Sequence, residues 1–316
     1  MLAIVLVCLF VACKGDAKEG SAAQREASAS ANESGNTSTG FSGTAAYNYA
    51  KAQVDFGPRV PGSPAAKRAG DWIIQQMRAR ADTVIVQSFT YTTADGKKLN
   101  LRNILARFRP ELEERVLYVT HWDSRPVSES ATTAAEKTMP VPGANDGASG
   151  VGLFVALGDV LKKTKPNVGV DLLFTDGEDY GQFGPPEVDV LIGSKYFAVH
   201  PPSPGYKPLY GVLWDMIGDK DLRIPYEMNS FQQAPEVVSR VWQTAADLGY
   251  GDTFVQESGG AIIDDHIPLL NSGMRVIDVI DLDYPPHHTP QDTMDKISAT
   301  SLAKVGDVAA ALVTRK

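Results

Sequence analysis

The sequence predicts an α/β fold: a single three-layer domain in which a mixed, mostly parallel β-sheet lies between helices. Apolar runs of strand length alternate with segments of helical periodicity through most of the chain. Before them, residues 83–93 and 99–108 alternate apolar and polar side chains around Asp95-Gly96, which indicates an opening antiparallel hairpin. No internal repeat or second-domain boundary is evident in the sequence.

The N-terminal residues predict a leader and a linker. Residues 1–13 are almost wholly apolar and end at Cys13, a pattern that resembles a bacterial lipoprotein signal; the alternative is a frayed apolar start with a chance cysteine. Residues 14–43 are rich in Ala, Ser, Gly and Glu, so we expect a flexible linker. Both cysteines, Cys8 and Cys13, lie in the signal, which leaves residues 44–316 without a disulfide or thiolate ligand.

Helices are expected where apolar side chains recur at helical spacing. Ser63 is a suitable N-cap with Pro64 at the first helical position, and Ser298 caps the final helix. The expected helices cover residues 44–55, 65–81, 151–161, 191–199, 234–248 and 298–313.

The later strands are apolar throughout, which is typical of strands buried on both faces of a parallel sheet. They are expected at residues 115–120, 168–174, 209–216 and 274–282. Ligands of such sheets lie beyond the carboxyl ends of the strands, so the residues that follow each strand are the candidates for a site.

Composition limits the partners. The chain has 30 Lys and Arg against 38 Asp and Glu, a net charge of −8, which argues against nucleic acid or an anionic membrane surface as a partner. With 316 residues and 43% hydrophobic side chains, the chain can bury a full core.

Acidic and histidine side chains follow one apolar run after another. They are His121, Asp123, Glu178, Asp179, Asp215 and His288, and Asp146 lies in the glycine turn before the central helix. Zinc accepts imidazole and carboxylate ligands, and a catalytic zinc has three protein ligands and an open position. With a carboxylate base nearby, such a set predicts a zinc-dependent catalytic domain at residues 44–316.

The same motifs resemble a known family, the zinc aminopeptidases with a phosphorylase-like fold, which includes the glutaminyl cyclases; the resemblance is strongest to bacterial glutaminyl-peptide cyclotransferase-like proteins. It covers residues 46–313. The motifs that carry it are His121-Trp122-Asp123-Ser124, Gly143-Ala144-Asn145-Asp146, Asp176-Gly177-Glu178-Asp179, Asp215, Asp264-Asp265-His266-Ile267-Pro268 and His288-Thr289.

The resemblance implies a role for each site residue. Asp146, Asp179 and His288 would hold the catalytic zinc, and Glu178 would be the general base. Asp215 and Asp264 would join a hydrogen-bond network with that base. The implied second metal position, if filled, would use His121 and Asp215 with Asp146 bridging, and Asp123 would orient His121.

Three positions depart from the pattern of the family. Asp179 stands where the family often has Glu, and Asp278 stands where animal cyclases carry His. His287 stands where cyclases usually place Trp, and by its position it competes with His288 as a ligand.

The predicted function is zinc-dependent glutaminyl-peptide cyclotransfer, the conversion of N-terminal glutamine to pyroglutamate with release of ammonia. The alternatives are a two-zinc aminopeptidase and a non-catalytic binding lipoprotein. We expect one zinc ion, or two for the peptidase, and peptide or protein N-termini as substrates. We further expect a monomer in the bacterial cell envelope, lipid-anchored through Cys13 or periplasmic or extracellular, with no other membrane contact.

Overall fold

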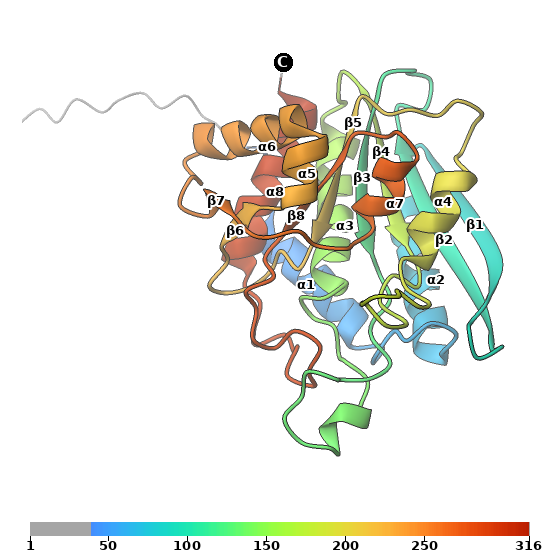
Figure 1. The fold of residues 1–316 in the computed structure, drawn as a ribbon. Helices are drawn as coiled ribbons and strands as arrows, with labels where there is room; N and C mark the ends of the chain where they lie inside the picture. Colours follow the sequence, from blue (N-terminus) through green and yellow to red (C-terminus); the bar gives the residue numbers. More distant parts are fainter. Residues whose placement is uncertain (1–38, 316) are drawn as a thin grey trace, which may run out of the picture. The chain divides into compact units, whose positions relative to one another are not determined.

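A six-stranded sheet with the order β1-β2-β4-β3-β5-β8 forms the middle layer of the fold, in a computed structural model that describes residues 39–315 (Figure 1). Its strands are β1 (Thr83–Thr92), β2 (Lys98–Phe108), β3 (Arg115–His121), β4 (Gly169–Thr175), β5 (Tyr210–Asp215) and β8 (Val276–Ile280). β1 and β2 form an antiparallel hairpin, and β2 runs antiparallel to β4. β4, β3, β5 and β8 are parallel, so their carboxyl ends share one edge. The predicted fold class is confirmed.

Helices cover both faces of this sheet (Figure 1). They are α1 (Gly43–Val54), α2 (Pro64–Arg78), α3 (Ala148–Lys163), α4 (Ile192–Val199), α6 (Pro235–Asp247), α7 (His266–Asn271) and α8 (Ala299–Thr314). Alternate side chains of β3 face different layers. Val116 and Tyr118 belong to the core that includes α1, α3 and α8, whereas Leu117 and Val119 pack with α4 and α7. Because successive side chains of a strand point to opposite faces, the same strand contributes to a hydrophobic core on each side of the sheet.

The central helix α3 is held between the sheet and two other helices. Of its 16 residues, 13 are buried, which is expected of a helix that has α1 and α8 on its far side. At Gly152 a Cβ atom would lie 2.4 Å from the carbonyl oxygen of Ala46 on α1, so glycine permits this close approach. The packing fixes the N-terminus of α3, where Asp146 lies.

The described part of the chain begins at residue 39, slightly before residue 44. Residues 39–42, which the sequence assigns to the linker, contact the domain: the ring of Phe41 lies against Gly306, and the hydroxyl of Thr39 donates to Asp307. The predicted signal, residues 1–13, and the linker up to residue 38 lie outside the described residues. Within residues 39–315, no helix has the length and hydropathy needed to cross a membrane.

Four short elements were not predicted from the sequence. Three lie between β5 and α7, namely β6 (Ile224–Tyr226), α5 (Met228–Gln233) and β7 (Phe254–Ser258), and the fourth is the 3-10 helix η1 (Glu136–Thr138), earlier in the chain. Each is too short to show a clear period. The side chain of Glu227 caps α5 by accepting from the backbone N–H groups of Asn229 and Ser230.

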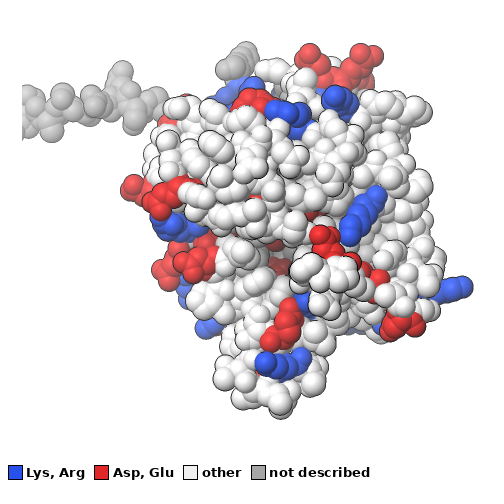
Figure 2. All heavy atoms as spheres, viewed as in Figure 1, with Lys and Arg blue, Asp and Glu red and all other residues white. Residues whose placement is uncertain are grey.

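The surface charges are mixed. Figure 2 shows Lys and Arg side chains lying near Asp and Glu side chains on the face that it draws, not gathered in one patch. Among the described residues on this face, positive charge is therefore not concentrated as a polyanion-binding surface requires.

Candidate metal centre

The candidate site lies at the carboxyl edge of the parallel strands, where a cavity of about 410 Å³ opens. β3, β4 and β5 each end in or just before residues of the site, and α3 begins at Ala148, two residues after Asp146. The cavity is lined by Asp146, Glu178, Asp179, Asp215, Asp264, His287 and His288, among others. Of the predicted strand-end and turn residues, Asp146, Glu178, Asp179, Asp215 and His288 line the cavity. His121 and Asp123 do not line it, but both contact residues that do.

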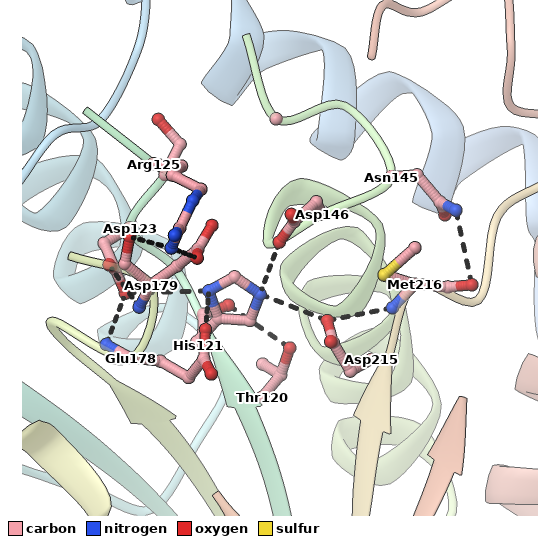
Figure 3. Close-up of polar contacts among 12 residues, drawn as sticks. Thr120, His121, Asp123, Arg125, Asn145, Asp146, Glu178, Asp179, Asp215 and Met216 are labelled. Atoms are coloured by element: carbon pink, nitrogen blue, oxygen red, sulfur yellow. Dashed lines mark hydrogen bonds and ion pairs between the residues drawn. The ribbon is translucent and has the colours of Figure 1, made fainter. Parts of the chain in front are cut away.

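His121 lies at the centre of the acidic cluster (Figure 3). Its Nε2 is 3.1 Å from Oδ1 of Asp215 and 3.1 Å from Oδ1 of Asp146. Its Nδ1 points the other way and is 3.7 Å from Oε2 of Glu178. The side chain is 1% exposed, and the carboxylates on both sides act to raise its pKa well above its usual range against the opposing effect of burial.

Asp123 contacts both His121 and the backbone of the turn after β4. Its Oδ1 lies 3.6 Å from Nδ1 of His121, and Asp123 is one of the groups that raise the pKa of this ring. Its two carboxylate oxygens also accept the backbone N–H groups of Glu178 and Asp179, each at 3.1 Å. Asp123 therefore fixes the turn that presents these two residues after β4.

A second buried carboxylate, Asp292, fixes the turn that holds Asp146. Asp292 accepts the backbone N–H of Asn145 at 2.8 Å and that of Asp146 at 3.1 Å. The following residue, Gly147, has φ +90°, and a Cβ there would lie 2.6 Å from the carbonyl oxygen of Asp123. Glycine is required at that position, because a side chain would be both strained and blocked.

The three predicted zinc ligands meet at His288. Its Nε2 lies 3.3 Å from Oδ1 of Asp179 and 3.7 Å from Oδ2 of Asp146. Its Nδ1 lies 2.8 Å from Oε1 of Glu129. A histidine that donates from one ring nitrogen to a carboxylate presents the other nitrogen for ligation, so the orientation is that of a metal ligand.

Arg125 and Glu129 were not predicted as site residues. Nη1 of Arg125 donates to Oδ1 of Asp179 at 2.6 Å, and its Nε donates to Oε2 of Glu129 at 2.7 Å. Arg125 is 5% exposed, and with Glu129 it joins Asp179 to His288. The signal available in the sequence was Arg125 itself, in the loop after His121.

Arg59 is a further residue that the sequence did not indicate. It is fully buried, and its guanidinium donates to the carbonyl oxygens of Pro142 and Gly143, the second at 2.6 Å. It thereby holds the first part of the glycine turn before Asp146.

Two groups of side chains bring one ligand atom each to within 4.8 Å of one another. They are Asp146 with His287 and His288, and His121 with Asp146 and Asp215. Asp146 belongs to both, as predicted for a bridging carboxylate. Asp179 belongs to neither, and its Oδ1 contacts His288 and Arg125.

Glu178 and Asp264 both line the cavity and are both buried. Burial raises the pKa of Glu178 well above its usual range; His121 opposes this shift and Asp264 adds to it. Burial also raises the pKa of Asp264, and the charge of Asp215 adds to that shift. Within the part of the chain that the structure describes, no direct hydrogen bond joins Glu178, Asp215 and Asp264 to one another.

The pKa values of Asp146 and Asp179 are shifted in opposite directions. Burial acts to raise the pKa of Asp146, but the hydrogen bond and charge of His121 and the charge of His288 outweigh it and lower the pKa. The pKa of Asp179 is raised by burial and by the neighbouring charge of Asp146. The two carboxylates repel each other, and a cation between them would relieve this repulsion.

The chain belongs to peptidase family M28, whose family model matches residues 103–313. The family that the sequence motifs suggested is thus confirmed, and so is the prediction of an enzyme. Among curated proteins, the chain is 26% identical over 287 residues to the glutaminyl-peptide cyclotransferase of Bos taurus, a match that covers 79% of this chain and 76% of that one.

Solved structures of both kinds of enzyme resemble the chain. The glutaminyl cyclase of Porphyromonas gingivalis is 38% identical with a TM-score of 0.83, and the match covers 86% of this chain and 97% of that one. A Zn-dependent exopeptidase from Parabacteroides distasonis is 35% identical with a TM-score of 0.82, covering 87% of this chain and 99% of that one. The fold and the family are therefore consistent with two activities, that of a glutaminyl cyclase and that of an exopeptidase.

Proposed function

We propose that this protein is a zinc-dependent glutaminyl-peptide cyclotransferase, which converts the N-terminal glutamine of peptides to pyroglutamate and releases ammonia. The observation that carries the proposal is the hydrogen bond of 3.1 Å between Nε2 of His121 and Oδ1 of Asp215. These two side chains satisfy each other, and Oδ1 of Asp215 also accepts the N–H of Met216 at 2.9 Å. This pair is complete without a second ion, and one ion suffices for a reaction whose nucleophile belongs to the substrate itself.

The residues fit a zinc ion. Oδ2 of Asp146 and Oδ2 of Asp179 are buried and have no hydrogen-bond partner among the described residues, and Nε2 of His288 faces both side chains. One imidazole and two carboxylates are a donor set that zinc accepts. Asp146, Asp179 and His288 would therefore hold the ion. A bound zinc ion would supply Lewis-acid polarisation of the substrate carbonyl.

Glu178 would move the proton. In the reaction, the α-amine nitrogen forms a bond to the side-chain carbonyl carbon, the bond from that carbon to the amide nitrogen breaks, and ammonia leaves. Glu178 would take a proton from the α-amine and give it to the departing nitrogen. Burial raises its pKa, which makes Glu178 a stronger proton acceptor than an exposed carboxylate. Asp264 lines the same cavity and contributes to that shift.

The alternative is a two-zinc aminopeptidase. The observation in its favour is the second ligand group, His121 with Asp146 and Asp215, which shares Asp146 with the first. The P. distasonis exopeptidase shows that a similar chain carries peptidase chemistry. Membership of an enzyme family argues against the non-catalytic binding protein.

One incubation separates these activities. Purified protein is given a Gln-peptide and a Leu-peptide, and ammonia release is scored against free amino acid. A cyclase releases ammonia from the Gln-peptide and leaves the Leu-peptide intact, whereas free leucine would establish the aminopeptidase. Metal analysis of the same sample is expected to give about one zinc per chain, and a stable two would support the peptidase.

We also propose that the protein acts in the bacterial cell envelope, tethered by a lipid on Cys13. The support is the apolar run that ends at this cysteine and the polar stretch that follows it. Incorporation of labelled palmitate that is lost in Cys13→Ala would bear this out; equal labelling of both proteins would contradict it.

A further inference from the structure

Two kinds of side chain line the cavity. The carboxylates of the candidate site line one part of it, which we call the carboxylate wall, and apolar residues that include Ile262, Ile263 and Leu282 line another part, which we call the apolar wall. Ile263 and Leu282 are each 42% exposed, although both are large apolar residues. Exposed apolar side chains at the rim of a polar cavity typically mark a contact surface for a ligand.

This apolar wall is held in place by hydrogen bonds. The backbone N–H of Ile262 donates to Oε1 of Glu227 at 2.9 Å, and its carbonyl oxygen accepts from Nδ2 of Asn229 at 2.9 Å. The side chain of Ile262 packs against Met216 and Ile280 under the rim. The contacts of Ile262 therefore fix the backbone directly before Ile263 relative to the cavity.

Apart from the metal position, which the glutamine side chain would occupy, the described lining of the cavity offers a substrate no free Lys or Arg side chain. Arg125 is the one Lys or Arg side chain among its described lining residues, and it is already engaged by Asp179 at 2.6 Å and by Glu129 at 2.7 Å. The carboxylates suit the α-amine of a peptide. A carboxylate elsewhere on the substrate would meet like charges without a compensating partner, which is unfavourable in a partly buried site.

We propose that Ile263 and Leu282 form a subsite for the side chain of the second residue of the substrate, which accepts apolar side chains and disfavours acidic ones. This inference rests on the proposed function, because it places the N-terminal glutamine against the carboxylate wall. The volume of about 410 Å³ is at the small end for ligand sites, so the N-terminal residue and the one after it fill it. The substrates are then peptides with an N-terminal glutamine followed by an apolar residue, and free glutamine is a poor substrate.

The test compares three C-terminally amidated peptides, Gln-Leu-Ala, Gln-Gly-Ala and Gln-Glu-Ala, by kcat/KM for ammonia release. We expect the Leu peptide to exceed the Gly peptide by about tenfold, because an apolar side chain is removed from water. We expect the Glu peptide to be the poorest of the three. Equal values for all three peptides would overturn the subsite while leaving the cyclase activity established.

Variants with a positive charge at the rim test whether Ile263 and Leu282 cause the preference at the second position. Leu282→Lys is expected to reduce the preference for Leu over Glu at the second position by at least tenfold, because the new ammonium group pairs with the acidic side chain. Val199→Lys is the matched control, since Val199 is 71% exposed and lies on α4 outside the cavity lining. Ile263→Lys gives an independent second variant, and thermal melting of each protein verifies that it is folded.

The outcomes separate the two proposals. If free glutamine replaces ammonia as the product, the cyclase proposal fails, and the dependence on the second residue still tests the subsite. If Leu282→Lys and Ile263→Lys both keep the wild-type preference, the subsite is contradicted. A preference that changes equally in Val199→Lys would also contradict it, because a general effect of surface charge would then explain the data.

Discussion

Nδ1 of His288 lies 2.8 Å from Oε1 of Glu129, a residue 159 positions earlier in the chain. Through this contact, the loop after β3 sets the orientation of a ring that belongs to the loop after β8. Arg125 donates both to Glu129 and to Asp179, so one buried guanidinium and one carboxylate position two candidate ligands from different loops.

Removal of this carboxylate is expected to weaken metal binding. In Glu129→Gln, the ring of His288 loses a charged acceptor, so zinc affinity should fall about 10–100-fold, as is usual when the hydrogen-bond partner of a ligand is removed. Competition with a chromophoric chelator measures this. The control is Glu113→Gln, an exposed position, which should bind zinc as the wild type does. An unchanged affinity in Glu129→Gln would mean that the contact has no role in ligation.

Glu178→Gln is expected to separate catalysis from metal binding. The amide cannot accept a proton, so turnover should fall by about 10²–10⁴-fold, the usual contribution of a general base. Zinc content should stay that of the wild type, because Glu178 is not one of the proposed ligands Asp146, Asp179 and His288. Turnover by ammonia release and zinc by elemental analysis are measured on one preparation; unchanged activity would falsify the role of Glu178 as base.

Asp123 should matter chiefly for stability. In Asp123→Ala the buried N–H groups of Glu178 and Asp179 lose their acceptor. Each such loss costs about 1–3 kcal/mol, so the free energy of unfolding should drop by a few kcal/mol. Urea denaturation at fixed zinc concentration measures the change. Asp123→Asn keeps one acceptor oxygen and should lose less; an Asn variant as unstable as the Ala variant would contradict this explanation.

Glu227 gives the fold a defined acid sensitivity. Burial acts to raise its pKa, but hydrogen bonds from His266 and Ser230 outweigh this effect and lower the pKa from 4.5 to about 2. A carboxyl whose pKa is lower in the folded state stabilises the fold above its unfolded pKa, and this contribution is lost as the pH falls from about 4.5 towards 2. Unfolding free energies measured between pH 6 and 3 should therefore decline more steeply for the wild type than for Glu227→Gln. Parallel curves would show that Glu227 is not the group responsible.

The position of the site at one edge of the sheet was predictable, because it follows from local patterns in the sequence. Apolar runs indicate buried strands, parallel strands end on one side, and the residues after them, such as His121, Glu178 and Asp215, must then meet. The approximate bounds of the principal helices and strands followed from the same periods. Short elements such as β6 and α5 did not, because three to six residues show no period.

The sequence by itself determined which side chains gather, because periodicity and strand order depend on neighbouring residues. Only the tertiary structure decided how they are held. Asp292 reaches the turn of Asp146 across 146 positions, and Glu129 reaches His288 across 159. The same is true of Asp123, which was expected to orient His121 and whose carboxylate also accepts two backbone N–H groups of the turn after β4, a contact that the sequence did not indicate. Contacts between loops depend on how whole elements pack, and no local pattern records that.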